Sequence, residues 1–232
     1  DETMARAEMR RLILAGALLG AAGGCATPRM APPADVVEAT ESLTTTGRKR
    51  ASGALVNESF QLGDYDVTNV DRKSEKSRSV GVGPWSKDTK TNGFTYELVA
   101  GDLELSGKCA AKSSSQGIGS ASGSVSWGSL EMACSCEDDG GKSELAMTDD
   151  ERWLKVVGEE YTLEPIYALE GGKKSSNPTG FRADSPDKEV LGAVEVVYPG
   201  QVWVKKGIDE AKKARIACVF AGLMLYQPPS DD

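Results

Sequence analysis

Histidine is absent from all 232 residues of the chain. This absence excludes Ser-His-Asp and Cys-His catalysis, histidine-ligated zinc or copper, and an imidazole pH switch. Aromatic residues are scarce at 6%, and 27 basic residues stand against 35 acidic ones, which gives a net charge of −8. Because a nucleic-acid-binding protein needs a basic surface, we expect no nucleic-acid partner.

Long apolar runs are also missing; of the two short ones, the first lies near the N-terminus. Residues Met9–Cys25 combine a basic start, an apolar run too short to span a bilayer, and small residues that end at a cysteine. This order is typical of a secretory signal. We expect residues 1–24 to be a signal peptide. Translation is expected to begin at Met9, because acidic residues precede it.

The end of this signal, Leu19–Cys25, resembles the lipobox of bacterial lipoproteins. The resemblance implies that Cys25 is lipidated and becomes the first residue of a protein anchored in the cell envelope. Ala26 stands where aspartate commonly retains lipoproteins in the inner membrane, so an outer-membrane location is favoured. The alternative is an ordinary cleaved signal in which Cys25 has no special role.

The remainder is predicted to form one domain behind a tether. Residues 25–53 are rich in Pro, Thr and Ala without a sustained apolar period, so they are interpreted as a lipidated cysteine followed by a disordered tether. Residues 54–228 are long enough for a single β-rich domain, and residues 229–232 form a tail. Within the domain, the mixed-charge stretch 71–79 and the Ser- and Gly-rich stretch 113–124 are predicted to be loops.

Residues 209–226 differ from the rest because they predict a helix. Acidic residues open this stretch, and the part from Ile216 to Tyr226 is apolar on every side, so the helix must be buried. The expected fold is mainly β: a single antiparallel barrel or sandwich with one apolar C-terminal helix. Many strands followed by one apolar helix resemble the tubby-like barrels, a resemblance that implies a helix threaded through the sheet.

Apart from Cys25, four cysteines remain, and export favours their oxidation to two disulfides. Cys134 and Cys136 are two residues apart on a predicted strand and face the same way, so each is expected to bond elsewhere. We therefore expect Cys109 to pair with one of them and Cys218 with the other. The alternative is a four-thiolate zinc or cuprous site, although the paired Cys-x-x-Cys spacing is missing.

Other chemistry-bearing patterns are weak. Glu137–Gly141 lacks the ligand spacing of a calcium loop and is interpreted as a charged hairpin tip. We expect no catalytic residue, metal or cofactor, and Trp203 is a candidate binding residue because it alternates with Val202 and Val204. The sequence thus predicts a non-catalytic binding or assembly module for an envelope protein, a glycan or a lipid. The alternative is an exported hydrolase that uses a carboxylate pair.

Overall fold

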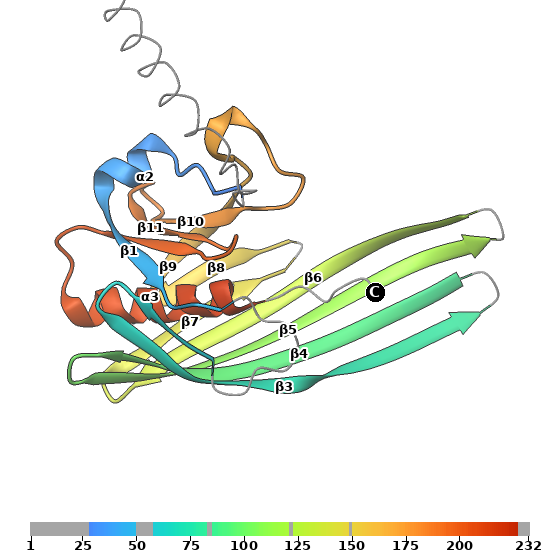
Figure 1. Ribbon diagram of the computed structural model, residues 1–232, viewed down its shortest axis with the longest axis horizontal. Coiled ribbons are helices and arrows are strands. Elements are labelled where there is room, and N and C mark those ends of the chain that lie inside the picture. Colours follow the sequence, from blue (N-terminus) through green and yellow to red (C-terminus); the bar gives the residue numbers. More distant parts are fainter. Residues whose placement is uncertain (1–27, 50–57, 83–84, 121–122, 149, 227–232) are drawn as a thin grey trace, which may run out of the picture.

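Twelve antiparallel strands form one closed barrel around a central helix (Figure 1). The computed structural model describes residues 28–49, 58–82, 85–120, 123–148 and 150–226, with the backbone alone for residues 73–82, 85–88, 113–120 and 123–130. The strands are β1 (Thr40–Thr46), β2 (Glu58–Leu62), β3 (Tyr65–Val82), β4 (Trp85–Ala100), β5 (Leu103–Ser120), β6 (Gly123–Asp138), β7 (Gly141–Met147), β8 (Arg152–Val156), β9 (Glu159–Ile166), β10 (Gly180–Asp184), β11 (Val190–Glu195) and β12 (Gln201–Lys205). The helices are α2 (Ala34–Ala39), the 3-10 turn η1 (Glu170–Gly172) and α3 (Glu210–Leu225). The mainly β prediction is confirmed, and of its two alternatives the structure is the barrel.

The predicted tether over residues 25–53 is wrong for its described part. α2 lies within it, and β1 closes the barrel by pairing with β12 at Thr40↔Lys205 and with β2 at Thr45↔Leu62. The domain therefore begins before the predicted boundary at residue 54. The single large apolar residue of β1, Leu43, is buried. The threonines of β1 favour an extended backbone, which pairs with a strand on each side. The predicted signal peptide, Cys25 and the tail lie outside the described residues.

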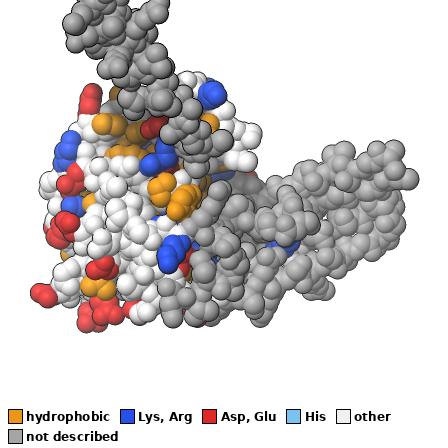
Figure 2. All heavy atoms as spheres, viewed as in Figure 1, with side chains coloured by type: hydrophobic (Ala, Val, Ile, Leu, Met, Phe, Trp, Pro, Cys, Tyr) orange, Lys and Arg blue, Asp and Glu red, His pale blue; other side chains and the backbone are white. Residues whose placement is uncertain are grey.

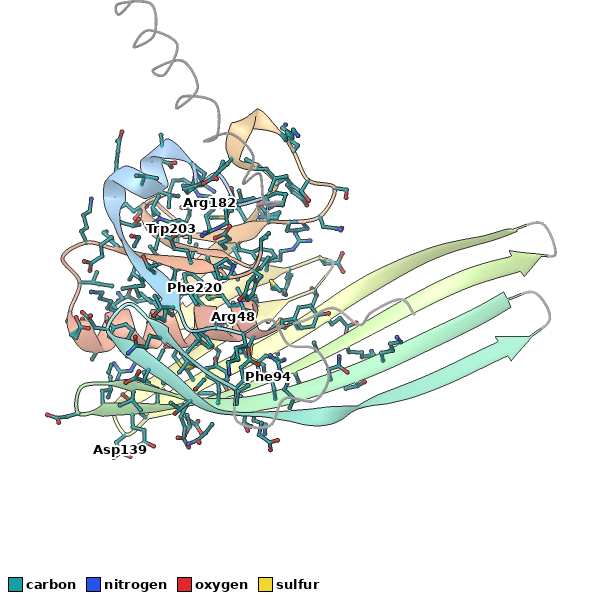
Figure 3. The ribbon with its side chains drawn as sticks, viewed as in Figure 1. Arg48, Phe94, Asp139, Arg182, Trp203 and Phe220 are labelled. Carbon is teal, nitrogen blue, oxygen red and sulfur yellow. A yellow bond between two sulfur atoms is a disulfide. The ribbon has the colours of Figure 1, made fainter. Side chains whose placement is uncertain are left out.

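α3 fills the inside of the barrel and makes it a packed core. Every residue from Ala214 to Leu225 is buried, and the helix contacts strands on several sides of the wall, including β5, β6, β11 and β12. Figure 3 places Phe220 of this helix between the walls that carry Trp203 and Phe94. Asp209 caps the helix by accepting a hydrogen bond from the Lys212 backbone N–H at 2.8 Å. The helix predicted over 209–226 is confirmed.

Two arginines satisfy the C-terminal end of α3, where helix carbonyls have no partner within the helix. Arg48 donates hydrogen bonds to the Met224 carbonyl and, at 2.7 Å, to the Pro199 carbonyl. Arg72 donates to the Leu225 carbonyl at 2.9 Å and forms an ion pair with the buried carboxylate of Glu58 at 2.8 Å. Cations at this end also oppose the negative pole of the helix dipole. A helix inside the barrel thus keeps its terminal carbonyls hydrogen-bonded.

Two disulfides lie in the core, one between two strands of the wall and one between the wall and α3. Cys109 of β5 bonds Cys134 of β6, and Cys136 of β6 bonds Cys218 of α3, as predicted from the shared face of Cys134 and Cys136. Both bonds lie in the core, and Gly222 of α3 lies against the first of them, where an added Cβ would come within 2.6 Å of the Cys109 sulfur. A close helix–wall approach therefore requires glycine at this position.

Strands β3 to β6 are much longer than the others, at 16 to 18 residues against 5 to 8. Beyond the last buried row, which includes Ala111 and Met132, they continue past the barrel as a four-stranded sheet (Figure 1). We call this part the arm; it comprises residues 76–82, 85–91, 112–120 and 123–131. Nine extended residues, as in the β5 portion, span about 30 Å. The loops predicted over 71–79 and 113–124 are therefore wrong wherever the chain is described there.

Candidate functional site

Trp203 lies beneath a layer of N-terminal residues. The alternation predicts that Trp203 and its two valine neighbours lie on opposite faces and leaves open which face is outside. Val202 and Val204 face the main core, so Trp203 faces the outside of the wall. There it packs in a second hydrophobic cluster with Met30 and Val36 and is only 7% exposed. The indole is covered by the chain itself. The structure therefore does not present Trp203 as an open binding residue.

Residues Arg29–Ala31 form a strap across this wall. Both the Nε and the Nη2 of Arg29 bond the Glu195 carboxylate, which is fully buried, with Nε at 2.8 Å from Oε1. The Met30 backbone N–H donates to the same carboxylate at 2.7 Å. The Ala31 N–H bonds the Ala168 carbonyl at 3.0 Å. Since a buried carboxylate must be paired and hydrogen-bonded, the strap is part of the folded body. Sequence reasoning missed it because its residues lack an apolar period.

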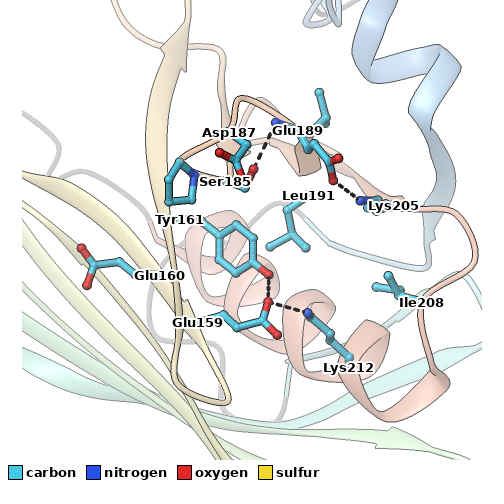
Figure 4. A pocket seen from close by; sticks show the side chains of 12 residues that line it. Glu159, Glu160, Tyr161, Ser185, Asp187, Glu189, Leu191, Lys205, Ile208 and Lys212 are labelled. Carbon is cyan, nitrogen blue, oxygen red and sulfur yellow. Dashed lines mark hydrogen bonds and ion pairs between the residues drawn. The ribbon is translucent and has the colours of Figure 1, made fainter.

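A cavity of about 460 Å³ opens between the start of β9, the β10–β11 connection, the end of β12 and the start of α3 (Figure 4). At its centre, Glu159 accepts hydrogen bonds from the Tyr161 hydroxyl and from Lys212 Nζ, the latter at 2.8 Å. On the opposite side, Lys205 Nζ bonds Glu189 at 2.7 Å. Each of these two carboxylates is thus paired with a lysine, and the cavity is lined by oppositely charged pairs.

The ionisation of these groups follows from their partners. The hydrogen bond from Lys212, and then that from Tyr161, lowers the pKa of Glu159 below its ordinary value. Lys205 likewise lowers the pKa of Glu189. Burial and the Glu159 hydrogen bond raise the pKa of Tyr161. A glycosidase general acid needs a carboxyl with a raised pKa, so Glu159 and Glu189 do not have the character of that group. The ion pairs of this cavity keep both carboxylates ionised, so the cavity suits contact with a polar or charged group.

A second cavity, of about 860 Å³, lies at the same end of the barrel, where the β4–β5 and β6–β7 hairpins turn. Figure 2 shows acidic side chains gathered at this end of the barrel, which is the end opposite the arm. Asp138 is paired with Arg215, because both of its carboxylate oxygens accept hydrogen bonds from that residue at 2.8 Å. In the described part of the chain, no group of three or more potential ligands is placed to hold a metal ion. The residues Glu137–Gly141 close the hairpin between β6 and β7.

The arm is the one large feature that sequence reasoning missed, although a signal for it is present. Val80-Gly81-Val82 and Val125-Ser126-Trp127 each alternate apolar and small residues, which is typical of a strand with one apolar face. The four arm segments hold five basic and two acidic residues, a net charge of +3, in a chain whose net charge is −8. Among the described residues, no strand pairs with the outer edge of β3 beyond Val70 or of β6 before Met132. The arm is thus a basic projection from an acidic body.

Cys25 lies outside the described residues, four positions before Arg29. None of the helices in the described part of the chain has the length and apolar content that a membrane span needs. No known protein family, curated protein or solved structure matches the chain.

Proposed function

We propose that the protein is a lipoprotein of the bacterial cell envelope, anchored through Cys25 and favouring the outer membrane. The barrel is a non-catalytic scaffold, and the arm is its binding or assembly element. The observation that carries this proposal is the arm itself, four strands that continue for about 30 Å past the core. Because α3 fills the barrel, recognition takes place on the outside of the molecule.

The strap supports a mooring close to the membrane. Four residues of extended chain reach at most about 14 Å, so an acyl chain on Cys25 holds the barrel at the bilayer surface. The strap bonds the ends of β9 and β11, whereas the arm continues β3 to β6, which lie on the opposite wall in the order of the barrel. The arm therefore projects from the side of the barrel away from the strap.

The anchor is tested by growing the full chain with labelled palmitate and separating membrane from soluble fractions. We expect the wild type to carry label and to sediment with membranes, and the Cys25→Ser variant to carry none and to become soluble. A Cys109→Ser/Cys134→Ser variant, with two substituted thiols distant from the signal, is the matched control and should still be labelled. Membrane-bound, unlabelled wild type would refute the lipid anchor.

The binding role is tested with a shortened arm. Ser77 pairs with Lys90 and Ser113 with Leu130, so residues 78–89 and 114–129 can each be replaced by Asn-Gly, which favours a tight hairpin turn. Pull-downs from detergent-solubilised envelope should recover species with the wild type that the shortened variant loses. Recovery of the same species by both would contradict the arm as the binding element.

A further inference from the structure

The strand register brings apolar residues from four separate segments into one row at the far end of the arm. Val82 pairs with Trp85, Trp85 with Ile118, and Ile118 with Val125. Residues directly opposite one another in a sheet share a face. All four positions of this row, which we call the tip row, are thus apolar and lie on the same face.

The next row on that face continues the pattern. Alternate residues of a strand share a face, so the row two residues behind the tip row belongs with it. This second row consists of Val80, Lys87, Gln116 and Trp127. The two rows together contain six apolar residues, among them two of the four tryptophans of the chain.

The opposite face has a different character. Its last row is Gly81, Ser86, Gly117 and Ser126, and the row before that is Ser79, Asp88, Ser115 and Gly128. These eight positions hold seven small residues and one acid. The arm is therefore amphipathic across four strands, a pattern that exists only once the register joins them.

Basic residues follow the apolar ones on the same face. Behind the second row come Arg78 with Thr89, Ser114 and Ser129, and then Lys76 with Thr91, Lys112 and Glu131. Including Lys87, this face carries four basic residues, and its one acidic residue is in the row farthest from the tip. Moving inward from the tip, the face thus changes from apolar to basic.

The geometry points to the surface of an anionic lipid bilayer as the partner of the arm. An element that lies in a bilayer interface buries apolar residues about 5–10 Å deep and places Lys and Arg among anionic headgroups. An arm that rests on this face places the tip row and the second row at that depth and turns the opposite face toward water, with the basic rows at the headgroups. Tryptophan is enriched at that depth because its ring is amphipathic. This inference rests on the proposed role of the arm as the binding element and names its partner.

The order of the rows, apolar at the tip and basic behind it, favours a lipid bilayer over a protein groove as the partner of the arm. A protein surface that received the tip would need its own pattern of acids behind an apolar pocket, whereas an anionic bilayer supplies both layers everywhere. The body of the protein carries the acidic excess, so the electrostatic attraction to anionic lipid comes from the basic arm.

The test is quenching of tryptophan fluorescence by brominated lipids, using the full chain with vesicles of brominated phosphatidylcholine, alone or with one third phosphatidylglycerol. We expect quenching that grows with the anionic lipid. It should be lost in a Trp85→Phe/Trp127→Phe variant and kept in Trp153→Phe, which removes a tryptophan of the barrel. Because the readout comes from the arm tryptophans, it does not depend on how the N-terminus attaches.

Neighbouring positions of β6 provide a matched pair that separates insertion from misfolding. Val125→Asp places a charge in the tip row and should abolish the arm-specific quenching, since losing one buried valine and adding a charge weakens partition by about tenfold or more. Ser126→Asp adds the same charge to the opposite face and should retain the quenching. Circular dichroism of both variants should match the wild type.

Three results would overturn the inference: no quenching with either vesicle, quenching that survives loss of both arm tryptophans, or equal effects of the two aspartate substitutions. Arm-dependent capture of an envelope protein without any quenching would replace the bilayer by a protein partner and leave the proposed function standing. Capture and quenching that are both independent of the arm would remove the proposed function as well.

Discussion

The same four strands build two regions with different demands. Inside the barrel, the inward rows of β3 to β6 are covered by α3, and residues such as Tyr96, Leu105 and Cys136 are buried. Beyond Met132 the sheet and its register continue past the end of α3 (Figure 1). The alternation of apolar and polar residues along the strands continues beyond the end of the core. The difference teaches that stability resides in the barrel, while the arm keeps an amphipathic pattern that folding does not use.

The largest effect should come from separating α3 from its wall. A Cys136→Ala/Cys218→Ala variant removes the disulfide that closes 82 residues, which constrains the unfolded chain by about 4.5 kcal/mol in the loop-entropy estimate. The Cys109→Ala/Cys134→Ala variant removes a link across 25 residues, worth about 3.5 kcal/mol. Urea unfolding monitored by circular dichroism measures both. An equal or reversed order would show that loop length does not govern the two bonds.

Next in size is the loss of the arginine that caps the far end of α3. Arg72→Ala leaves the Leu225 carbonyl and the buried Glu58 carboxylate without this partner, and breaking a buried pair costs about 3 kcal/mol. The matched control is Arg152→Ala on the exposed side of β8, expected to stay within about 0.5 kcal/mol of the wild type. Urea unfolding of the two variants tests this. Similar losses in both would contradict a specific role for the cap.

Alkaline pH should weaken the barrel through its buried tyrosines. Tyr96 is fully buried and donates a hydrogen bond to the Cys218 carbonyl at 2.7 Å, and burial raises its pKa above the ordinary value near 10. The unfolded chain ionises this group near pH 10 while the folded chain keeps it protonated. The stabilisation is therefore complete below pH 10 and is lost as pH rises toward the folded pKa, by about 1.4 kcal/mol per pH unit.

Urea unfolding between pH 9 and 11.5 measures this slope. Tyr96→Phe should reduce the slope, at a cost of about 1 kcal/mol at neutral pH for the lost hydrogen bond. An unaltered slope in Tyr96→Phe would assign the alkaline loss to other groups.

A part of the fold could be predicted from the sequence where the residues of one segment determine its structure by themselves. The apolar stretch from Ile216 to Tyr226 has no face for water, so a buried helix follows from composition alone. The disulfide pairing followed from Cys134 and Cys136 sharing a face, a property of one strand. Both predictions are confirmed because the determining information is local.

The strap and β1 could not be predicted in the same way. In Thr40–Thr46 only Leu43 is large and apolar, and the strap is fixed by Glu195, which is distant in sequence. The cover over Trp203 comes from Met30 of the strap and Val36 of α2, so the burial of Trp203 could not be inferred from the alternation around it. Such segments are ordered by partners elsewhere in the chain, and composition alone makes them resemble a tether.

The arm was missed for a related reason. Its β5 and β6 segments are rich in Ser and Gly, and a single pair such as Ile118 and Val125 carries little weight by itself. The tip row appears only when the register sets these two beside Trp85 and Val82. Because long-range pairing decides the face, the amphipathic pattern is a property of the sheet and not of any one segment.

The smallest change in the free energy of unfolding is expected for the variant with a shortened arm, and this variant distinguishes the barrel from the arm most sharply. Replacing residues 78–89 and 114–129 by Asn-Gly turns removes most of the arm but no residue of the barrel core. The free energy of unfolding should change by about 0.5 kcal/mol or less, as for surface changes, while the urea dependence falls because less surface is exposed on unfolding. A stability loss comparable to that of the Cys136→Ala/Cys218→Ala variant would show that the arm folds as one cooperative unit with the barrel. In that case its pattern would serve folding, and the apolar tip would no longer call for a partner.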